Sequence, residues 1–429
     1  MKRRIIILLL ITTVIFSVSF ADAKDVYLAK VSGVINPPIV GFLEEAIEKA
    51  TQHDAEALVI LLDTPGGLDT SMRDIIKRIM DADIPVIVYV APSGARAASA
   101  GSIILLASHI AAMAPGTNVG AAHPVAIGKD NGDKTMMKKV VQDAEAYAKS
   151  IAAQRGRNED WAAKAVTESV SITAKEALDK NVIDILADSV EDLLAQIDGG
   201  TVETKKAKVT LQTKGATTVE IPMPFKFRFL SYISDPNVAY ILMMIGIYGI
   251  LFEFYSPGTI FPGVIGGISI VLALYAFQAI PISFAGLALI LLGVIFFILE
   301  VKIVSHGLLG IAGIVSVVIG SVMLIDLPYS VLAISLKSII IVAVLSAIFV
   351  FGILSFAVKA QLSKVKTGLE GLVGETGVSK TDIVAMGKGK VLVHGELWSA
   401  VSEEAISEGD SVTVTGMDNL VIKVKKKGG

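Results

Sequence analysis

A serine among small residues is the first candidate for chemistry in this chain. Ser99 lies in the loop 93–101, directly before the apolar run 102–107, which predicts a short helix. The small neighbours leave the hydroxyl accessible, and the positive end of a helix dipole would stabilise an oxyanion that forms beside it. The same pattern fits an ordinary N-cap serine, so it does not by itself establish a nucleophile.

A pair of glycines supplies candidate groups for binding that oxyanion. Gly66 and Gly67 end the segment 63–67, which follows the apolar run 57–62. Glycine permits a positive φ and exposes its amide N–H, so amides of this segment could face Ser99. Glycine pairs are also common in plain turns. The two loops strengthen one another because both are expected at the same edge of one sheet.

A serine nucleophile needs a general base, and the chain offers three candidates. His123 lies in the segment 120–124 and could pair with the serine. Lys138 and Lys139 open a predicted helix that runs to about residue 155, and a desolvated lysine can accept a proton near neutral pH. Most lysines on such a helix are solvated and most single histidines are structural, so the residues alone leave the choice open.

Alternating strands and helices must position these loops. Short apolar runs predict strands, and apolar residues at three- and four-residue spacing predict helices. Their alternation indicates βαβ units and a largely parallel sheet. Ligands of such sheets gather beyond the carboxyl ends of the strands, where the loops 63–67 and 91–101 lie. The predicted strands are 26–35, 57–62 and 85–90, and the predicted helices are 38–52 and 69–81.

Composition excludes several classes of protein. Of the 429 residues, 53% are apolar and 18% charged, and the mean hydropathy is +0.67. Soluble domains have about 25% charged residues, so a purely soluble globular protein is not expected. The net charge of −3 gives no basic field that would attract nucleic acid. The absence of cysteine excludes disulfides, cysteine nucleophiles and cysteine-bound zinc.

The chain begins with a targeting pattern. Three basic residues at 2–4 precede the apolar core 5–20, and Ala-Asp-Ala at 21–23 has the spacing of a cleavage site. These features predict a secretory signal peptide over 1–23, with an uncleaved N-terminal anchor as the alternative. Either would place the chain from residue 24 onward outside the cytoplasm.

Residues 237–358 have the composition of a membrane region. Runs of about 20 apolar residues predict bilayer-spanning helices. Five crossings would put the C-terminus in the cytoplasm, in agreement with the lysines that follow the last run. Gly263 and Gly267 have a spacing that lets helices approach closely, and Glu253 and Glu300 are either functional intramembrane carboxylates or interface residues. The five predicted spans are 237–255, 259–280, 282–301, 306–325 and 336–358.

The last part of the chain, 367–427, predicts a small β domain. Its strand-forming runs 372–378, 389–394, 396–401, 411–415 and 420–425 are separated by glycine, which is typical of a five-stranded barrel with the oligonucleotide/oligosaccharide-binding (OB) topology. Trp398 is its only aromatic residue, whereas nucleic-acid readers of this fold need several. A protein-interaction domain is therefore expected. Residues 199–236 fit either an extra hairpin or a linker.

Three sequence blocks resemble the motifs of ClpP-class serine peptidases. They are LDTPGG at 62–67, ASAG at 98–101 and MAPGTNVGAAHP at 113–124. The chain is more closely similar to the long form of the NfeD family, membrane-bound serine proteases paired with stomatin-like proteins, and more distantly to signal-peptide peptidase A. The C-terminal blocks GLVG at 371–374, GELWSA at 395–400 and EGDSV at 408–412 also match the NfeD pattern.

The resemblance implies a multi-domain fold and a domain order. The expected parts are an α/β ClpP/crotonase-like protease domain over 24–198, a linker or β extension over 199–236, a transmembrane region of about five helices over 237–358, and a small all-β OB-like domain over 367–427. The protease domain would lie outside the cytoplasm and the OB-like domain inside it, in a multi-pass protein of a prokaryotic cell membrane.

The resemblance also implies a Ser–Lys dyad. The nucleophile falls on Ser99 and the base on Lys139, with Lys138 as the choice after a one-residue slip and a Ser–His mechanism through His123 as the remaining alternative. The oxyanion hole falls on the amides of Gly67 and Ala100. No cofactor or metal is expected. The implied substrates are apolar, membrane-proximal peptide segments, cleaved in membrane protein quality control.

The implied partners are a stomatin/SPFH-like membrane protein and further copies of the same chain, without nucleic acid. The competing interpretation is a non-catalytic membrane scaffold that recruits the stomatin-like protein through its OB-like domain.

Overall fold

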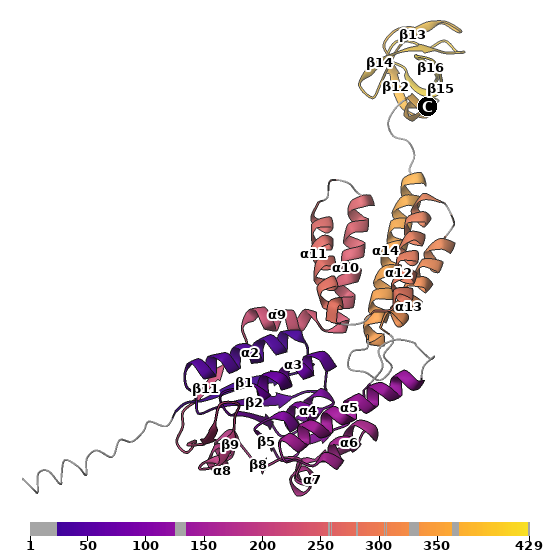
Figure 1. Ribbon diagram of the computed structural model, residues 1–429. Coiled ribbons are helices and arrows are strands. Elements are labelled where there is room, and N and C mark those ends of the chain that lie inside the picture. Colours follow the sequence, from indigo (N-terminus) through magenta and orange to yellow (C-terminus); the bar gives the residue numbers. More distant parts are fainter. Residues whose placement is uncertain are drawn as a thin grey trace, which may run out of the picture. The chain divides into compact units, whose positions relative to one another are not determined.

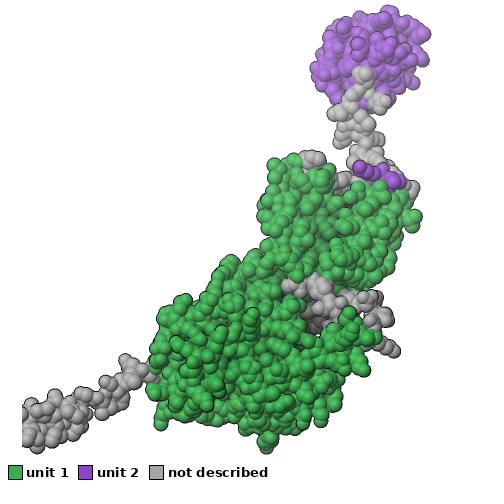
Figure 2. All heavy atoms as spheres, in the orientation of Figure 1, with its two compact units in different colours: residues 1–300, 305–347 green, residues 301–304, 348–429 purple. Residues whose placement is uncertain are grey.

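The computed structural model describes residues 24–124, 134–255, 258, 260–279, 282–303, 305, 307–325, 334–362 and 369–427. The chain divides into two compact units, residues 1–300 with 305–347, and residues 301–304 with 348–429 (Figure 2). The predicted signal peptide, 1–23, lies outside the described residues.

A six-stranded sheet forms the centre of the N-terminal domain (Figure 1). All five strand pairings are parallel, in the order β11-β1-β2-β3-β5-β8, which confirms the predicted parallel sheet. The central strand β3 is buried at every residue, as expected of an apolar strand that is covered on both faces. The strands are β1 (Val26–Ser32), β2 (Ala57–Asp63), β3 (Val86–Val90), β5 (Ile110–Met113), β8 (Ile185–Leu186) and β11 (Thr218–Ile221).

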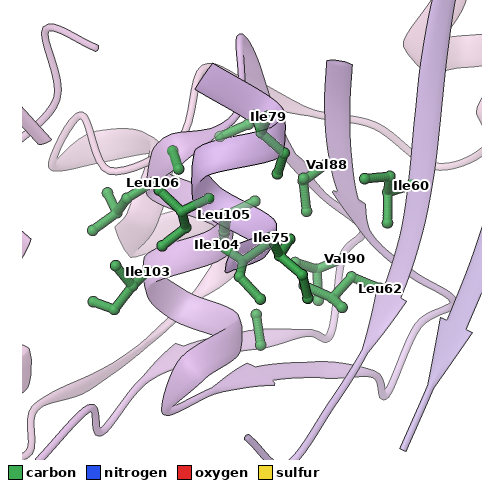
Figure 3. Packing of buried hydrophobic residues seen from close by; sticks show 14 of the residues in the cluster. Ile60, Leu62, Ile75, Ile79, Val88, Val90, Ile103, Ile104, Leu105 and Leu106 are labelled. Carbon is green, nitrogen blue, oxygen red and sulfur yellow. The ribbon is translucent and has the colours of Figure 1, made fainter. Parts of the chain in front are cut away.

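Helices α2 (Pro37–Gln52), α3 (Asp69–Met80) and α4 (Ala100–Ala107) pack their apolar side chains on one face of this sheet. Figure 3 shows Ile75 and Ile79 of α3 beside the residues 103–106 of α4, over the side chains of β2 and β3. Helix α2 starts where predicted because the Asn36 side chain accepts the Ile39 N–H and two prolines follow. The helices predicted over 38–52 and 69–81 are confirmed.

A second, three-stranded sheet lies at the carboxyl edge of the first and is made of β4 (Arg96–Ala98), β6 (Asn118–Gly120) and β7 (Ser171–Thr173). The remaining helices of the domain are α5 (Lys134–Gln154), α6 (Glu159–Thr167), α7 (Ala174–Asp179) and α8 (Val190–Ile197). Helix α8 contributes Leu193, Leu194 and Ile197 to a second apolar cluster that covers the other face of the main sheet.

A buried arginine holds the end of α4. The Arg157 guanidinium donates to the Leu106 and Ser108 carbonyls at 2.6 and 2.9 Å, and to the Asp184 carboxylate at 2.5 Å. Asp184 also accepts the Ala111 N–H at 2.7 Å. These bonds satisfy carbonyls that a helix end leaves without partners, so α4 is fixed at the end opposite Ser99.

Residues 199–236 extend the domain. Strands β9 (Thr201–Glu203) and β10 (Lys208–Thr210) form an antiparallel hairpin, and β11 then adds the edge strand beside β1. Helix α9 (Phe225–Ile233) follows and contacts α2. The segment thus contains both a hairpin and a strand of the main sheet.

Five apolar helices follow at the positions predicted for membrane spans. They are α10 (Pro236–Tyr255), α11 (Phe261–Ala279), α12 (Phe284–Lys302), α13 (Leu308–Leu324) and α14 (Leu336–Leu362). Among the described residues, the stretches Pro236–Phe254 and Phe261–Gln278 are long and apolar enough to cross a membrane, and the apolar stretches of the other three helices are shorter. The apolar helices are therefore as predicted, and the count of five crossings stays a prediction.

Glycines allow close packing within two pairs of these helices. A methyl group on Gly266 of α11 would come 2.9 Å from the Gly246 carbonyl of α10, and one on Gly293 of α12 would come 2.7 Å from the Gly313 carbonyl of α13. Gly263 also packs closely, against Glu253, but a methyl group on Gly267 would meet open space. The prediction that Gly263 and Gly267 both allow a close helix approach is wrong for Gly267. Helix α10 packs against the neighbouring residue, Gly266, instead.

Glu300 is a buried helix cap. Its carboxylate accepts the N–H groups of Gly307 and Gly310, both at 2.9 Å, and the Ser305 hydroxyl. These groups lie at the start of α13, where N–H donors lack helical partners. Glu300 therefore joins α12 to α13. Its interpretation as an interface residue stays a prediction.

The second unit contains a closed five-stranded barrel in the order β12-β13-β14-β16-β15, which confirms the predicted barrel. Its strands are β12 (Thr376–Ser379), β13 (Lys388–Val393), β14 (Glu396–Val401), β15 (Ser411–Asp418) and β16 (Val421–Lys426). The first strand begins later than predicted, because Leu369–Leu372 forms a 3-10 helix. Trp398 packs against the apolar interior of the barrel.

Candidate active site

Ser99 occupies a strained turn between β4 and α4. Its φ of 51° and ψ of −118° are unfavourable for a residue with a side chain. Although Ser99 is at the N-cap position, its side chain makes no capping hydrogen bond. The ordinary N-cap interpretation is therefore wrong. A partly buried serine on a sharp strand-to-helix turn is the arrangement that presents serine nucleophiles in hydrolases.

Backbone bonds on two sides impose this turn. The Ser99 N–H donates to the Gly120 carbonyl at 3.1 Å, beyond the parallel pairing of β4 with β6. On the other side, the Ala98 N–H donates to Thr64 at 3.1 Å, and the Thr64 N–H donates to Arg96 at 2.7 Å. Ser99 is thus held between the loop after β2 and the end of β6.

Gly66 comes directly against Ser99. Its φ is +116°, and a methyl group on it would lie 2.6 Å from Ser99 Cβ. The Gly66 N–H donates to Thr64 Oγ1 at 3.0 Å, and the Gly66 carbonyl accepts the Ile35 N–H at 2.9 Å. The neighbouring Gly67 also needs its missing side chain, since a methyl group there would collide with the Ile35 carbonyl. Close approach requires both glycines, and the positive φ of Gly66 favours glycine there as well.

Two amides near Ser99 are free to bind an oxyanion. Ala100 is the first residue of α4, where an N–H has no helical partner. Within the residues that the structure describes, neither the Ala100 nor the Gly67 N–H donates a hydrogen bond. Both belong to segments that meet at the Gly66–Ser99 contact. The positive end of α4 adds to their attraction for negative charge.

Three residues that sequence reasoning did not single out hold this geometry. Buried Thr64 fixes the Gly66 turn through its hydroxyl. Gly101 lets α4 lie against Thr64, since a methyl group on Gly101 would collide with the Thr64 side chain, and Gly120 supplies the carbonyl for Ser99. Only their places inside the LDTPGG, ASAG and MAPGTNVGAAHP blocks could have identified them.

His123 has a proton arrangement suited to a base. Its Nδ1 lies 2.7 Å from the Val166 carbonyl. A carbonyl only accepts, so Nδ1 carries the proton and Nε2 of the neutral ring has a free lone pair. Among the described residues, however, Nε2 makes no hydrogen bond with Ser99 Oγ.

Lys138 and Lys139 lie in the first turns of α5 and are exposed. In the described part of the chain, neither forms a hydrogen bond or an ion pair with Ser99. The structure therefore brings together Ser99, Gly67 and Ala100, and it leaves all three candidate bases without a direct bond to the serine.

The later turns of α5 are fixed to α3, which starts just after the glycine loop. Arg73 of α3 donates to Asp143 of α5 at 2.6 Å and lies 4.3 Å from the ring centre of Tyr147. Burial lowers the pKa of Arg73, but its bonds to Asp69 and Asp143 outweigh this and raise it. Burial raises the pKa of the Tyr147 hydroxyl. The body of the lysine helix is thus anchored, while its first turns are exposed.

Three family models match successive parts of the chain. The N-terminal domain of NfeD1b matches residues 25–219, the NfeD integral membrane domain matches 237–356, and the NfeD-like C-terminal, partner-binding domain matches 369–426. Outside the membrane region, the matches cover the sheet domain and the closed barrel. The middle match identifies a membrane protein.

Two relatives match nearly the full length. The membrane-bound protease PH1510 of Pyrococcus horikoshii is 36% identical over 99% of both chains. Membrane protein NfeD1b of Bacillus subtilis is 25% identical over 91% of this chain and 90% of its own.

The solved structures that resemble this chain include the 1510-N membrane-bound stomatin-specific protease. One is a lysine-to-alanine mutant with a substrate peptide, 37% identical over 49% of this chain and 98% of the other, with a TM-score of 0.46. Another is a serine-to-alanine mutant, 36% identical over 47% and 98%, with a TM-score of 0.44.

Proposed function

This chain belongs to the NfeD family, and on that premise we propose that it is a membrane-bound serine endopeptidase. Ser99 is the nucleophile, Lys139 the general base, and the amides of Gly67 and Ala100 the oxyanion hole. The observation that carries the proposal is the strained turn of Ser99 against Gly66, beside two amides that find no acceptor among the described residues. Strain of this kind is maintained where a function uses it.

The reaction would be acyl transfer. Neutral Lys139 takes the proton of Ser99 Oγ as this oxygen attacks a peptide carbonyl carbon, and the carbonyl oxygen becomes an oxyanion bound by the two amides. The C–N bond then breaks, and Lys139 gives its proton to the departing amine. Water attacks the acyl-enzyme with Lys139 again as base, which frees the acid and restores Ser99.

This mechanism requires the first turns of α5 to come against Ser99. Lys139 is exposed to solvent in the structure. Exposed apolar side chains at Met136 and Val140 flank it, at 59% and 43% exposure. A substrate or a second copy of the chain that covered these side chains would also remove water from Lys139, and loss of water favours the neutral form of an amine.

The proposed substrates are apolar peptide segments near the membrane, and the proposed partner is a stomatin-like protein. PH1510 is named as a membrane-bound protease, and the 1510-N structure as specific for a stomatin homologue. The barrel would bind this partner, since its match is a partner-binding domain and its strand order fits the OB topology. The sheet domain would have the ClpP-class fold and lie outside the cytoplasm, with the barrel inside.

A non-catalytic scaffold is the second candidate, and the exposure of both lysines is the observation that favours it. Cleavage of apolar peptides by the purified full chain in lipid nanodiscs separates the two. We expect cleavage by wild type and by Ser93→Ala, a control serine in the loop before β4, and none by Ser99→Ala or Lys139→Ala. No cleavage by any folded form, with or without a stomatin-like partner, would favour the scaffold.

A further inference from the structure

Helix α9 exposes an aromatic face. Phe225, Phe229 and Tyr232 are 73%, 40% and 69% exposed, and Arg228 beside them is exposed as well. Their spacing of three, four and seven residues places all four side chains on one side of the helix. The Phe225 and Phe229 rings are stacked, with 5.8 Å between the ring centres. Contiguous exposed aromatic side chains indicate a binding surface.

The opposite face of α9 is fixed to the N-terminal domain. A methyl group on Gly41 of α2 would lie 2.7 Å from the Phe227 ring. The Asn36 side chain donates to the Ser231 hydroxyl at 3.1 Å, and Lys226 pairs with Glu45. The aromatic face therefore points away from α2, and its direction is set by these contacts.

The chain itself indicates what covers the aromatic face. Helix α10 begins at Pro236, three residues after α9 ends at Ile233, and it is long and apolar enough to cross a bilayer. The start of α10 therefore lies at a membrane surface. Aromatic rings concentrate at that depth, and an arginine among them can bind lipid phosphates.

We propose that α9 is an interfacial helix whose Phe225, Phe229 and Tyr232 side chains lie in the headgroup region of the bilayer, with Arg228 at the lipid phosphates. The occupant of the aromatic face is thus the membrane surface. Through Phe227, Ser231 and their contacts with α2, the same helix holds the N-terminal domain against the bilayer.

Hydrogen bonds also connect this helix to the candidate site. Asn36, which bonds Ser231, follows Ile35, whose N–H donates to Gly66 at 2.9 Å and whose carbonyl accepts the Leu68 N–H at 3.0 Å. The membrane-bound helix is thus connected through Asn36 to the loop that carries Gly66 and Gly67. The idea that this helix brings a peptidase site to membrane-proximal substrates rests on the proposed function. The membrane contact itself does not depend on that function.

Site-specific fluorescence tests the proposal, because the chain contains no cysteine. Single variants Phe225→Cys, Phe229→Cys and Tyr232→Cys, made in the full chain, are labelled with a polarity-sensitive dye and placed in nanodiscs. Leu178→Cys, at an apolar residue of α7 that is 38% exposed, is the matched control. We expect nitroxide lipids to quench the three α9 labels several-fold more than the control, and aqueous iodide to quench them several-fold less.

Two results would overturn the proposal. Equal iodide quenching at all four positions would show that the face is in water, and protection from both quenchers would show that protein covers it. Thermal unfolding near that of wild type confirms that each variant is folded. The same quenching in a Ser99→Ala background is expected, so failure of the membrane contact and failure of the peptidase proposal are distinguishable.

Discussion

Gly66 lies so close to Ser99 that a methyl group on it would come 2.6 Å from Ser99 Cβ and 3.2 Å from Oγ. This contact joins the loop after β2 to the start of α4, and it places the two free amides beside one hydroxyl. The candidate site depends on this approach, because Ser99 keeps its unfavourable φ only while its neighbours hold it there.

Substitution of Gly66 by alanine should therefore abolish peptide cleavage. The methyl group would displace Ser99 and the amides, and a displacement of about 1 Å can reduce a rate about 100-fold. Gly94→Ala is the matched control, because Gly94 also has a positive φ, of +88°, but open space around it. Gly94→Ala should cost only the roughly 1–2 kcal/mol of a left-handed alanine and keep its activity. Equal losses of kcat in the two variants would contradict the importance of the contact.

The Thr64 hydroxyl should matter for both stability and turnover. Thr64→Val keeps the shape but leaves the buried Gly66 N–H without its acceptor, which costs about 1–3 kcal/mol. The loosened turn should lower kcat more than it raises KM, as measured by steady-state cleavage. Thr70→Val, at an exposed position of α3, should leave both unchanged. A Thr64→Val enzyme with wild-type kcat would show that the hydroxyl does not position the loop.

His109 should make the N-terminal domain less stable in mild acid. Its ring is largely removed from water and lies near Arg155, and both effects lower its pKa from 6.5 to about 4. Between about pH 4 and pH 6.5, the His109 side chain binds a proton in the unfolded chain but not in the folded one. The free energy of unfolding should therefore fall as the pH drops from about 6.5 to about 4, by no more than roughly 3 kcal/mol.

Denaturant unfolding at several pH values measures this dependence. His109→Asn keeps an acceptor for the Val86 N–H, which His109 Nδ1 now accepts at 3.2 Å, and should lose this part of the slope. His53→Asn, at an exposed histidine, should keep it. An unchanged slope in His109→Asn would contradict the assignment.

Removal of the Glu300 carboxylate should loosen the α12–α13 pair. Glu300→Ala leaves the N–H groups of Gly307 and Gly310 without acceptors in a buried place, at a cost of about 1–3 kcal/mol each. Glu300→Gln keeps one acceptor oxygen and should lose less. We expect the thermal unfolding temperature of the full chain in nanodiscs to fall in the order wild type, Glu300→Gln, Glu300→Ala. A glutamine variant less stable than the alanine variant would contradict a capping role.

Local patterns predicted most of the fold. The parallel strands, the helices α2 and α3, the five apolar helices and the barrel follow from hydrophobic periodicity and turn residues, which act over a few neighbours. The edge strand β11 did not, because it pairs with β1 across more than 180 residues of chain. The choice of Gly266 over Gly267 also depends on where a second helix lies.

The candidate site was predictable in part. Ser99 and the glycine pair could be found, since small residues and turn glycines mark accessible backbone. The bonds of Thr64, the carbonyl of Gly120 and the anchoring of α5 by Arg73 and Asp143 could not, because they join segments that are distant in sequence. The exposure of Lys139 agrees with the solvation expected of most lysines on such a helix.

Covalent capture of Ser99 tests the central claim most directly. An apolar peptide fluorophosphonate would form a P–O bond with Ser99 Oγ and release fluoride, while the base takes the proton. Mass spectrometry of the full chain in nanodiscs, after digestion, should find the adduct on the peptide that contains Ser99 in wild type, Lys138→Ala and His123→Ala, and at least 100-fold slower capture in Lys139→Ala. Capture that persists in Lys139→Ala and is lost in His123→Ala, or no adduct on Ser99 in folded wild type, would contradict the Ser99–Lys139 dyad.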